Sequence, residues 1–242
     1  MNNIQLVNSV THKDTRIITR RSPEFGDNVM FASTFPMEFR AVQAHYPILF
    51  QKNRETGRFN PIALFGFEDE ENLFLTEAGW SATYIPLMIQ RLPFHIGYQA
   101  APVGSSSDKT RVMHINMNSP RVSRVEGERL FLEQGGTTEY LDRMAAMLET
   151  MYNWSEHGKD FDLALAEHNL LEEVAFDITL DNGVQRQLLG FSTINEDALA
   201  RLDGRALQQL QEKNYLQPIY MAIASISNIN TLAKLKSRQV TN

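Results

Sequence analysis

The sequence predicts an α+β fold, in which an N-terminal antiparallel meander is followed by a hairpin and a helix-rich C-terminal half. Three observations favour this class. Residues 31–98 hold 13 of the 23 aromatic residues, in short apolar runs separated by turn-forming residues. Apolar residues at helical spacing become frequent only after residue 136, and one hairpin signal interrupts them. A chain with strands in its first part and helices in its second is typical of α+β proteins. Regular alternation of strands and helices along the chain would instead indicate a parallel, doubly wound sheet.

Short strands joined by turns are predicted in the first half of the chain. The apolar runs 46–52 and 59–67 flank a Gly-containing connection, so they predict an antiparallel hairpin. Further strand patterns occur at 15–19, 73–75, 94–98, 111–116 and 128–132. The small, polar residues 104–108 predict a mobile surface loop.

Helices are predicted mainly in the second half. Apolar residues between 139 and 154 follow the i, i+3, i+4, i+7 rule of an amphipathic helix. Pro86 suits the first turn of an earlier helix over 84–91, which Pro93 prevents from continuing. Further helical stretches are expected at 161–171, 196–202, 206–213, 219–226 and up to residue 235.

Two local signals mark boundaries in the second half. The dipeptide Asn-Gly after Asp181 predicts a tight hairpin turn between two strands of alternating polarity. Thr193 and Glu196 resemble a capping box that opens the helix at 196–202. The whole chain, residues 1–242, is predicted to form a single domain with lobes at about 1–136 and 137–242, a size sufficient for a substantial core.

Composition excludes several classes of function. The formal net charge of -6 argues against sequence-independent nucleic-acid binding. No apolar run reaches the roughly 18 to 20 residues of a membrane-spanning helix. The N-terminal residues lack a basic leader with an apolar segment, so the cytoplasm is the expected location, with leaderless export as an open alternative. The absence of cysteine excludes disulfides, thiolate metal sites and cysteine nucleophiles.

Catalytic and cofactor motifs are missing from the sequence. There is no Gly-x-Ser-x-Gly elbow, no dinucleotide-binding glycine motif and no phosphate-binding loop, so no cofactor is expected. His12 and Asp14 match half of a two-histidine, one-carboxylate iron site, a pattern that also arises by chance. The acidic run 68–71 offers carboxylates to a hard cation, but it lacks the spacing of a calcium loop and reads as a polar turn.

Four residues in or near the aromatic block are candidates for binding a ligand or partner. Trp80 and Tyr84 are candidate pocket walls, and Arg91 suits the recognition of an anionic group. His45 is a candidate general base or a structural hydrogen-bonding histidine. Aromatic residues at such spacings also serve as ordinary core. The methionines Met144, Met147 and Met151 on the predicted helix at 139–154 suit either core packing or an adaptable partner surface.

The chain resembles the SapC family of bacterial proteins in many short motifs. In the first half these are His45-Tyr-Pro-Ile48, Ala63-Leu-Phe-Gly-Phe-Glu68, Glu71-Asn-Leu-Phe74, Gly79-Trp80, Tyr84-Ile-Pro86 and Arg91-Leu-Pro-Phe94. Later come Asn118-Ser-Pro-Arg-Val122, Gly127-Glu-Arg-Leu-Phe131, Gly190-Phe-Ser-Thr-Ile-Asn-Glu196, Ile219-Tyr220 and Ser227-Asn228. Asn116 and Asn118 stand where the family pattern leads us to expect acidic residues, which implies weaker binding of any cation held there.

The resemblance implies an association with a surface-layer system, and with genes for outer-membrane receptors and halogenase-like or cupin-like enzymes. It supplies no catalytic residues. The unrelated peptide-transporter permease of the same name needs membrane spans, which this sequence lacks. We therefore expect a non-catalytic accessory or binding protein for a peptide or protein partner, and the sequence predicts no oligomeric state. The alternatives are a metal-dependent enzyme, in which the fold brings His45, His95 and His114 together with carboxylates, and a structural surface-layer component.

Overall fold

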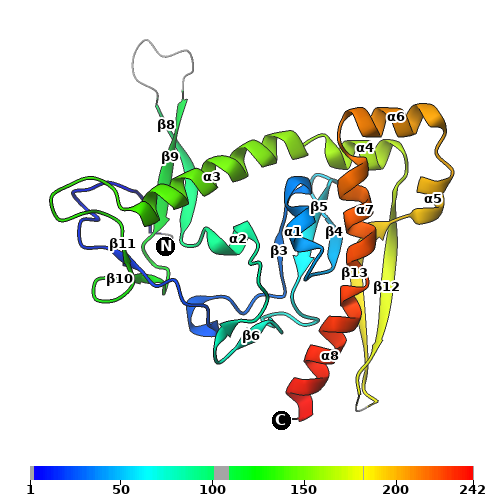
Figure 1. Ribbon diagram of the computed structural model, residues 1–242, viewed down its shortest axis with the longest axis horizontal. Coiled ribbons are helices and arrows are strands. Elements are labelled where there is room, and N and C mark those ends of the chain that lie inside the picture. Colours follow the sequence, from blue (N-terminus) through cyan, green and yellow to red (C-terminus); the bar gives the residue numbers. More distant parts are fainter. Residues whose placement is uncertain (1–2, 101–108, 182, 242) are drawn as a thin grey trace. The chain divides into compact units, whose positions relative to one another are not determined.

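The computed structural model describes residues 3–100, 109–181 and 183–241 (Figure 1). The predicted mobile loop at 104–108 therefore lies outside the described residues. The observed class is α+β: the strand pairings are antiparallel, and the helices are concentrated in the C-terminal half. The predicted fold class is thus confirmed.

Contacts within the chain define two compact units that alternate along the sequence. The predicted lobes follow the change of composition along the chain, whereas each unit combines two separate stretches. The first unit comprises Met1–Asp27 and Ile89–Asn153, and the second comprises Asn28–Met88 and Trp154–Asn242.

The first unit contains two small antiparallel sheets. One has the strand order β1-β9-β8, with β1 at Ile4–Leu6, β9 at Lys109–Asn116 and β8 at Phe94–Ala100. The other has the order β10-β2-β11, with β10 at Val122–Ser123, β2 at Arg16–Ile17 and β11 at Glu128–Arg129. The predicted strands at 94–98 and 111–116 are confirmed.

The helix α3 (Glu139–Gly158) begins in the first unit and continues into the second. Its apolar stripe is buried in the first unit, where the ring of Tyr140 contacts that of Phe94 with 6.3 Å between centroids. Met144 and Met151 are buried, so these methionines of the predicted stripe serve as core. The short 3-10 helix η1 (Pro23–Phe25) precedes the first crossing between units.

The second unit contains a five-stranded antiparallel sheet of order β12-β13-β4-β5-β3. Its strands are β3 (Phe31–Ser33), β4 (Ile48–Lys52), β5 (Phe59–Leu64), β12 (Leu171–Thr179) and β13 (Gln185–Ile194). Both predicted hairpins, β4–β5 and β12–β13, are confirmed, with Asn182 of the second turn outside the described residues. The two hairpins join through Ser192 and Phe50, so the meander and the late hairpin form one sheet. A separate pair is formed by β6 (Leu75–Thr76) and β7 (Gly79–Trp80).

In the second unit α7 packs against β4 and β13 of this sheet and against α1 (Figure 1). The helical elements are η2 (Pro36–Glu38), α1 (Phe39–Val42), α4 (Phe161–Glu167), α5 (Glu196–Ala200), α6 (Gly204–Glu212), α7 (Leu216–Ser225) and α8 (Asn228–Thr241). At the boundary between units, α2 spans only Leu87–Gln90, shorter than the predicted helix at 84–91.

Two predicted helix boundaries are wrong, for local reasons. The helix predicted at 161–171 ends at Glu167, because Asn169 adopts a left-handed conformation with φ 52° and Leu171 already belongs to β12. The cap of α5 is Asn195, whose side chain accepts a hydrogen bond from the backbone N–H of Ala198, whereas Thr193 is still part of β13. Asn195 lies directly before the helix, so its side chain reaches the free N–H groups.

Candidate functional site

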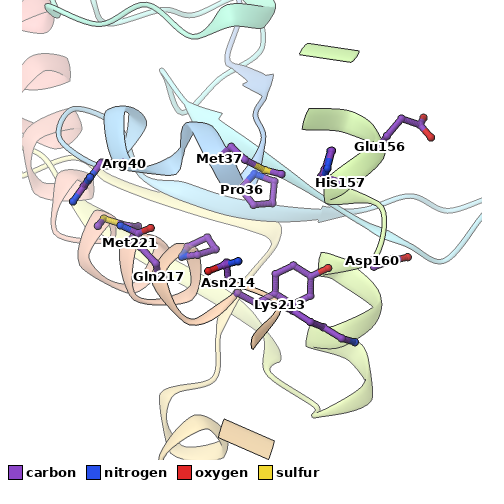
Figure 2. Close-up of a pocket in the computed structure, with 12 residues that line it drawn as sticks. Pro36, Met37, Arg40, Glu156, His157, Asp160, Lys213, Asn214, Gln217 and Met221 are labelled. Carbon is purple, nitrogen blue, oxygen red and sulfur yellow. The ribbon is translucent and has the colours of Figure 1, made fainter. Parts of the chain in front are cut away.

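A cleft of about 800 Å³ opens in the second unit (Figure 2). Its walls come from three separate parts of the sequence: the start of η2 and α1, the end of α3 with the turn before α4, and the connection from α6 to α7. The lining residues are Pro36, Met37, Arg40, Glu156, His157, Asp160, Lys213, Asn214, Tyr215, Gln217, Pro218 and Met221.

Local sequence explains why the chain turns at these places. Pro36 occupies the first turn of η2, where a missing backbone donor costs nothing. Asn214 follows α6 with φ 59°, a left-handed conformation that asparagine tolerates better than most residues. Only the three residues 213–215 separate α6 from α7, and Pro218 again lies in a first helical turn. Two prolines and an asparagine thus shape the turns that line the cleft.

The floor of the cleft is apolar and adaptable. Pro36, Met37, Tyr215, Pro218 and Met221 contribute carbon and sulfur atoms to it, and Met37 is 41% exposed. Methionine has an unbranched, polarisable side chain that fits partners of different shapes. An exposed methionine at a concave surface is therefore suited to receiving an apolar side chain from a ligand.

Charged side chains are distributed unevenly along the cleft. Figure 2 shows Arg40, Gln217 and Met221 at one end and Glu156, His157 and Asp160 at the other. This separation gives the cleft two chemically different ends.

Of the carboxylates at the acidic end, Glu156 has a cationic partner. Glu156 pairs with Lys159 at 2.5 Å. The pKa of Arg58 is raised, chiefly by its hydrogen bonds to Asp162 and to a smaller extent by the charge of Asp160. Burial raises the pKa of Tyr215, and the charges of Asp160 and Asp162 raise it further.

The arginine end has no such compensation among the described residues. Arg40 forms no ion pair there, and the nearby carboxylate of Glu38 is buried and committed to other groups. Glu38 accepts hydrogen bonds from the Thr34 hydroxyl, the Tyr84 hydroxyl and the Leu87 N–H. The Arg40 guanidinium is therefore available to an anionic group from outside.

A second, smaller pocket of about 390 Å³ is also lined by Pro36 and by residues from the end of α3. Its polar wall is the ion pair of Arg58 with Asp162, in which both guanidinium branches contact the carboxylate. Because each partner already satisfies the other, this pocket offers an outside ligand fewer open charges than the cleft does.

The sequence candidates Trp80 and Tyr84 are half-buried in the second unit, and hydrogen bonds to buried residues hold their side chains. Trp80 donates its indole N–H to the Tyr46 hydroxyl at 2.7 Å, and its ring is stacked on that of Phe74. Tyr84 donates its hydroxyl to Glu38 at 2.8 Å. Burial is the main cause that raises the pKa of Tyr84, with further increases from Glu38. Both side chains lie outside the lining of the cleft.

His45 and Arg91 also lie outside that lining, and they belong to different units. His45 shares a hydrogen bond of 2.9 Å with the Thr83 hydroxyl through Nε2. Arg91 donates to the Phe94 carbonyl at 2.8 Å and contacts His95 Nδ1 at 2.9 Å. A binding role for these four candidates stays a prediction from the sequence.

The histidines of the metal hypothesis are brought together only in part. His95 and His114 face each other across β8 and β9 in the first unit, whereas His45 belongs to the second. Within residues 3–100, 109–181 and 183–241, no three His, Asp or Glu side chains are close enough to hold a metal ion.

The other sequence positions considered for metals have structural contacts. His12 is fully buried and its Nδ1 accepts a hydrogen bond from the Asn8 N–H, whereas Asp14 is exposed. Asn116 accepts the Asn118 N–H at 3.0 Å and so stabilises the turn after β9. In the acidic run, Glu68 pairs with Arg186 and Lys236, and Glu71 also pairs with Lys236. This run is therefore more than a solvated turn.

Two histidines of the first unit predict a dependence of stability on pH. Burial is the largest cause that lowers the pKa of both His12 and His95 below the ordinary 6.5. Below about pH 6.5 the two histidines bind protons in the unfolded chain but stay neutral in the folded unit. The free energy of unfolding therefore decreases as the pH is lowered. We expect NMR titration midpoints below 6.5 for both imidazoles, and a smaller loss of stability in acid for His12→Gln. Midpoints above 6.5 would contradict this assignment.

The sequence contains few signals that could have revealed the cleft. Its residues come from distant stretches. The helices predicted at 139–154, 206–213 and 219–226 lie near their observed positions, but nothing in their patterns indicates that their ends meet at one cleft. Met37 and Arg40 follow the proline of a short helical segment that no periodic pattern marks.

Comparison with known proteins adds the family. No curated protein and no solved structure gives a significant match to the chain. In the part of the chain that the structure describes, no helix is long and apolar enough to span a membrane. The family model named SapC matches residues 7–232, which is nearly the whole sequence. The chain therefore belongs to the SapC family.

Proposed function

We propose that this protein is a non-catalytic binding protein and that the cleft in its second unit receives a segment of a peptide or protein partner. The observation that carries the proposal is the combination of an exposed, methionine-containing floor with an uncompensated arginine at one end. Apolar floors with a few polar groups are typical of ligand sites. Adaptable methionines are typical of surfaces that accept peptide segments.

The partner is proposed to come from a surface-layer or outer-membrane-receptor system. Support for this finer statement comes from the family resemblance alone, so the test must use identified proteins. The products of genes next to the gene for this chain are the proper set. A cytoplasmic location and the exclusion of nucleic acid stay predictions from the sequence, and cell fractionation checks the location.

Charge placed on the floor of the cleft should weaken partner binding. Met221→Glu puts a carboxylate where an apolar side chain would be buried, and we expect at least a tenfold rise in Kd, which corresponds to about 1.4 kcal/mol. The measurement is calorimetric titration of the purified chain with each neighbouring gene product.

The matched control is Leu189→Glu. Leu189 is 58% exposed on β13 in the same unit and lies outside the cleft lining, so its replacement should leave Kd unchanged. The proposal fails if no neighbouring product binds the chain. It also fails if both variants weaken binding equally, because binding would then use another surface.

The two alternatives receive no specific support from the described residues. The metal-dependent alternative lacks a set of three donor side chains there. A structural surface-layer role predicts self-assembly, which light scattering of the purified chain would detect.

A further inference from the structure

We infer that the segment bound in the cleft carries an acidic group next to an apolar side chain, with the carboxylate on Arg40 and the apolar group on Met37 and Met221. This inference rests on the proposed function and adds the chemistry of the ligand. It follows from the electrostatic difference between the two ends of the cleft.

Arg40 supplies the anchor for the carboxylate. Its guanidinium is exposed and has no ion-pair partner among the described residues. Guanidinium groups bind carboxylates through two parallel hydrogen bonds, which fixes the orientation of the bound group as well as its charge. Gln217 lies at the same end of the cleft and can donate a further hydrogen bond from its side-chain amide (Figure 2).

The nearest acidic residue in the sequence cannot neutralise Arg40. The Glu38 carboxylate is 2% exposed and accepts three hydrogen bonds, from Thr34, Tyr84 and Leu87. Since Glu38 is held in the interior, the positive charge of Arg40 faces the cleft without an internal partner.

The end of the cleft that contains Glu156 and Asp160 does not strongly attract a basic group of the ligand. Glu156 is paired with Lys159, and Asp160 lies in the field of Arg58. Lys213 also lines the cleft and forms no ion pair with a described residue. Asp160 likewise forms no ion pair with a described residue, so the two cations Arg40 and Lys213 outnumber the one unpaired carboxylate of the cleft, which favours an acidic segment over a basic one.

The methionines of the cleft form the surface on which the apolar side chain of the ligand would pack. Met37 and Met221 line the same cleft as Arg40, from η2 and α7. A leucine or phenylalanine beside the acidic residue would lose its hydration on the methionine surface while the carboxylate stays at the rim, where water completes its solvation.

Three synthetic peptides test this inference. The first alternates leucine with glutamate, and the other two replace glutamate by glutamine or by lysine. The readout is the NMR signals of 13C-labelled methionine methyl groups, with Met37 and Met221 assigned from Met37→Leu and Met221→Leu. We expect the glutamate peptide to shift both signals, with an affinity about fivefold above that of the lysine peptide.

Arg40→Glu should reverse this order, so that the lysine peptide binds more tightly than the glutamate peptide. Arg205→Glu is the matched control, because Arg205 is exposed on α6 in the same unit and outside the cleft lining. That variant should keep the order of the unmodified chain.

Each other outcome overturns a defined part. If all three peptides shift Met37 and Met221 equally, the cleft binds peptides as proposed but the assignment of the acidic group to Arg40 is wrong. If the glutamate peptide keeps its preference in Arg40→Glu, the assignment is also wrong. If no peptide shifts either signal while a neighbouring gene product still binds elsewhere, both the inference and the cleft as binding site fail.

Discussion

Replacing Asp27 by alanine is expected to lower the free energy of unfolding of the first unit by about 3–5 kcal/mol. Asp27 is fully buried and its carboxylate pairs with Arg121 at 2.5 Å and with Arg21 at 3.3 Å. Arg121 is itself only 1% exposed. Removal of the carboxylate leaves two largely buried guanidinium groups without their anion. An unpaired charge in the interior lowers the stability of the folded state strongly.

The rest of the cluster explains why it cannot relax easily. Arg121 also donates to the backbone carbonyls of Ile18 and Arg20, and Asp27 accepts the Ser22 N–H. The ion pair therefore connects the segment after β2 to the segment before β10. Loss of Asp27 would loosen both segments together.

The measurement is hydrogen exchange of the β8 and β9 amides, because both tryptophans belong to the second unit and do not report on the first. Glu149→Ala is the control. It breaks the ion pair of Arg111 with Glu149, whose side chains are 41% and 50% exposed, and exposed ion pairs contribute little to stability because water and salt screen them. A similar small effect for Asp27→Ala would show that the buried cluster does not stabilise this unit.

Replacing Tyr46 by alanine is expected to cost the second unit about 3–5 kcal/mol from lost packing alone. The ring is fully buried and lies between Phe65, Phe74 and Trp80, with centroid distances of 5.2, 4.7 and 6.4 Å. Edge-to-face contacts between aromatic rings add to the effect of burial. The variant would leave a large cavity at the centre of this cluster.

The hydroxyl of Tyr46 makes a separate contribution. It accepts the Trp80 indole N–H and donates to the Tyr84 carbonyl, so it joins β7 to the segment before α2. Tyr46→Phe keeps the ring and should cost only about 1–3 kcal/mol, since two polar groups lose their partner. Comparison of the two variants separates packing from hydrogen bonding.

Urea unfolding followed by tryptophan fluorescence measures both effects, because Trp80 contacts the substituted side chain directly. Tyr220→Ala serves as control, since Tyr220 is 54% exposed and its loss should change stability by about 0.5 kcal/mol or less. Equal unfolding midpoints for Tyr46→Ala and Tyr220→Ala would contradict the assigned role of the aromatic cluster.

Local elements could be predicted from the sequence because short-range spacing determines them. The amphipathic period of α3 and the turn residues of both hairpins depend only on neighbours in the chain. The joining of β13 to β4 depends instead on residues about 140 positions apart, Ser192 and Phe50, and no local pattern specifies such a pairing.

The candidate site could be predicted far less well, for the same reason. Trp80 and Tyr84 were conspicuous as aromatic residues, but their polar atoms are used by Tyr46 and Glu38 inside the unit. Arg40 was inconspicuous, and it becomes a candidate only because folding commits Glu38 elsewhere and brings α7 to the same cleft. Whether a charged side chain is free to bind a ligand depends on its neighbours in the folded protein, so the sequence alone does not show it.

The alternation of the two units along the chain limits how the protein can be divided. The chain passes from one unit to the other after Asp27, after Met88 and after Asn153. A cut at residue 136 would separate the last part of the first unit from the rest of that unit, so neither fragment would contain a complete unit. Both units also need contacts between residues far apart in the sequence, which requires closing long loops during folding. Truncation from one end should therefore not yield a stable fragment. A fragment that joins residues 28–88 directly to residues 154–242 would contain the second unit and every residue that lines the cleft.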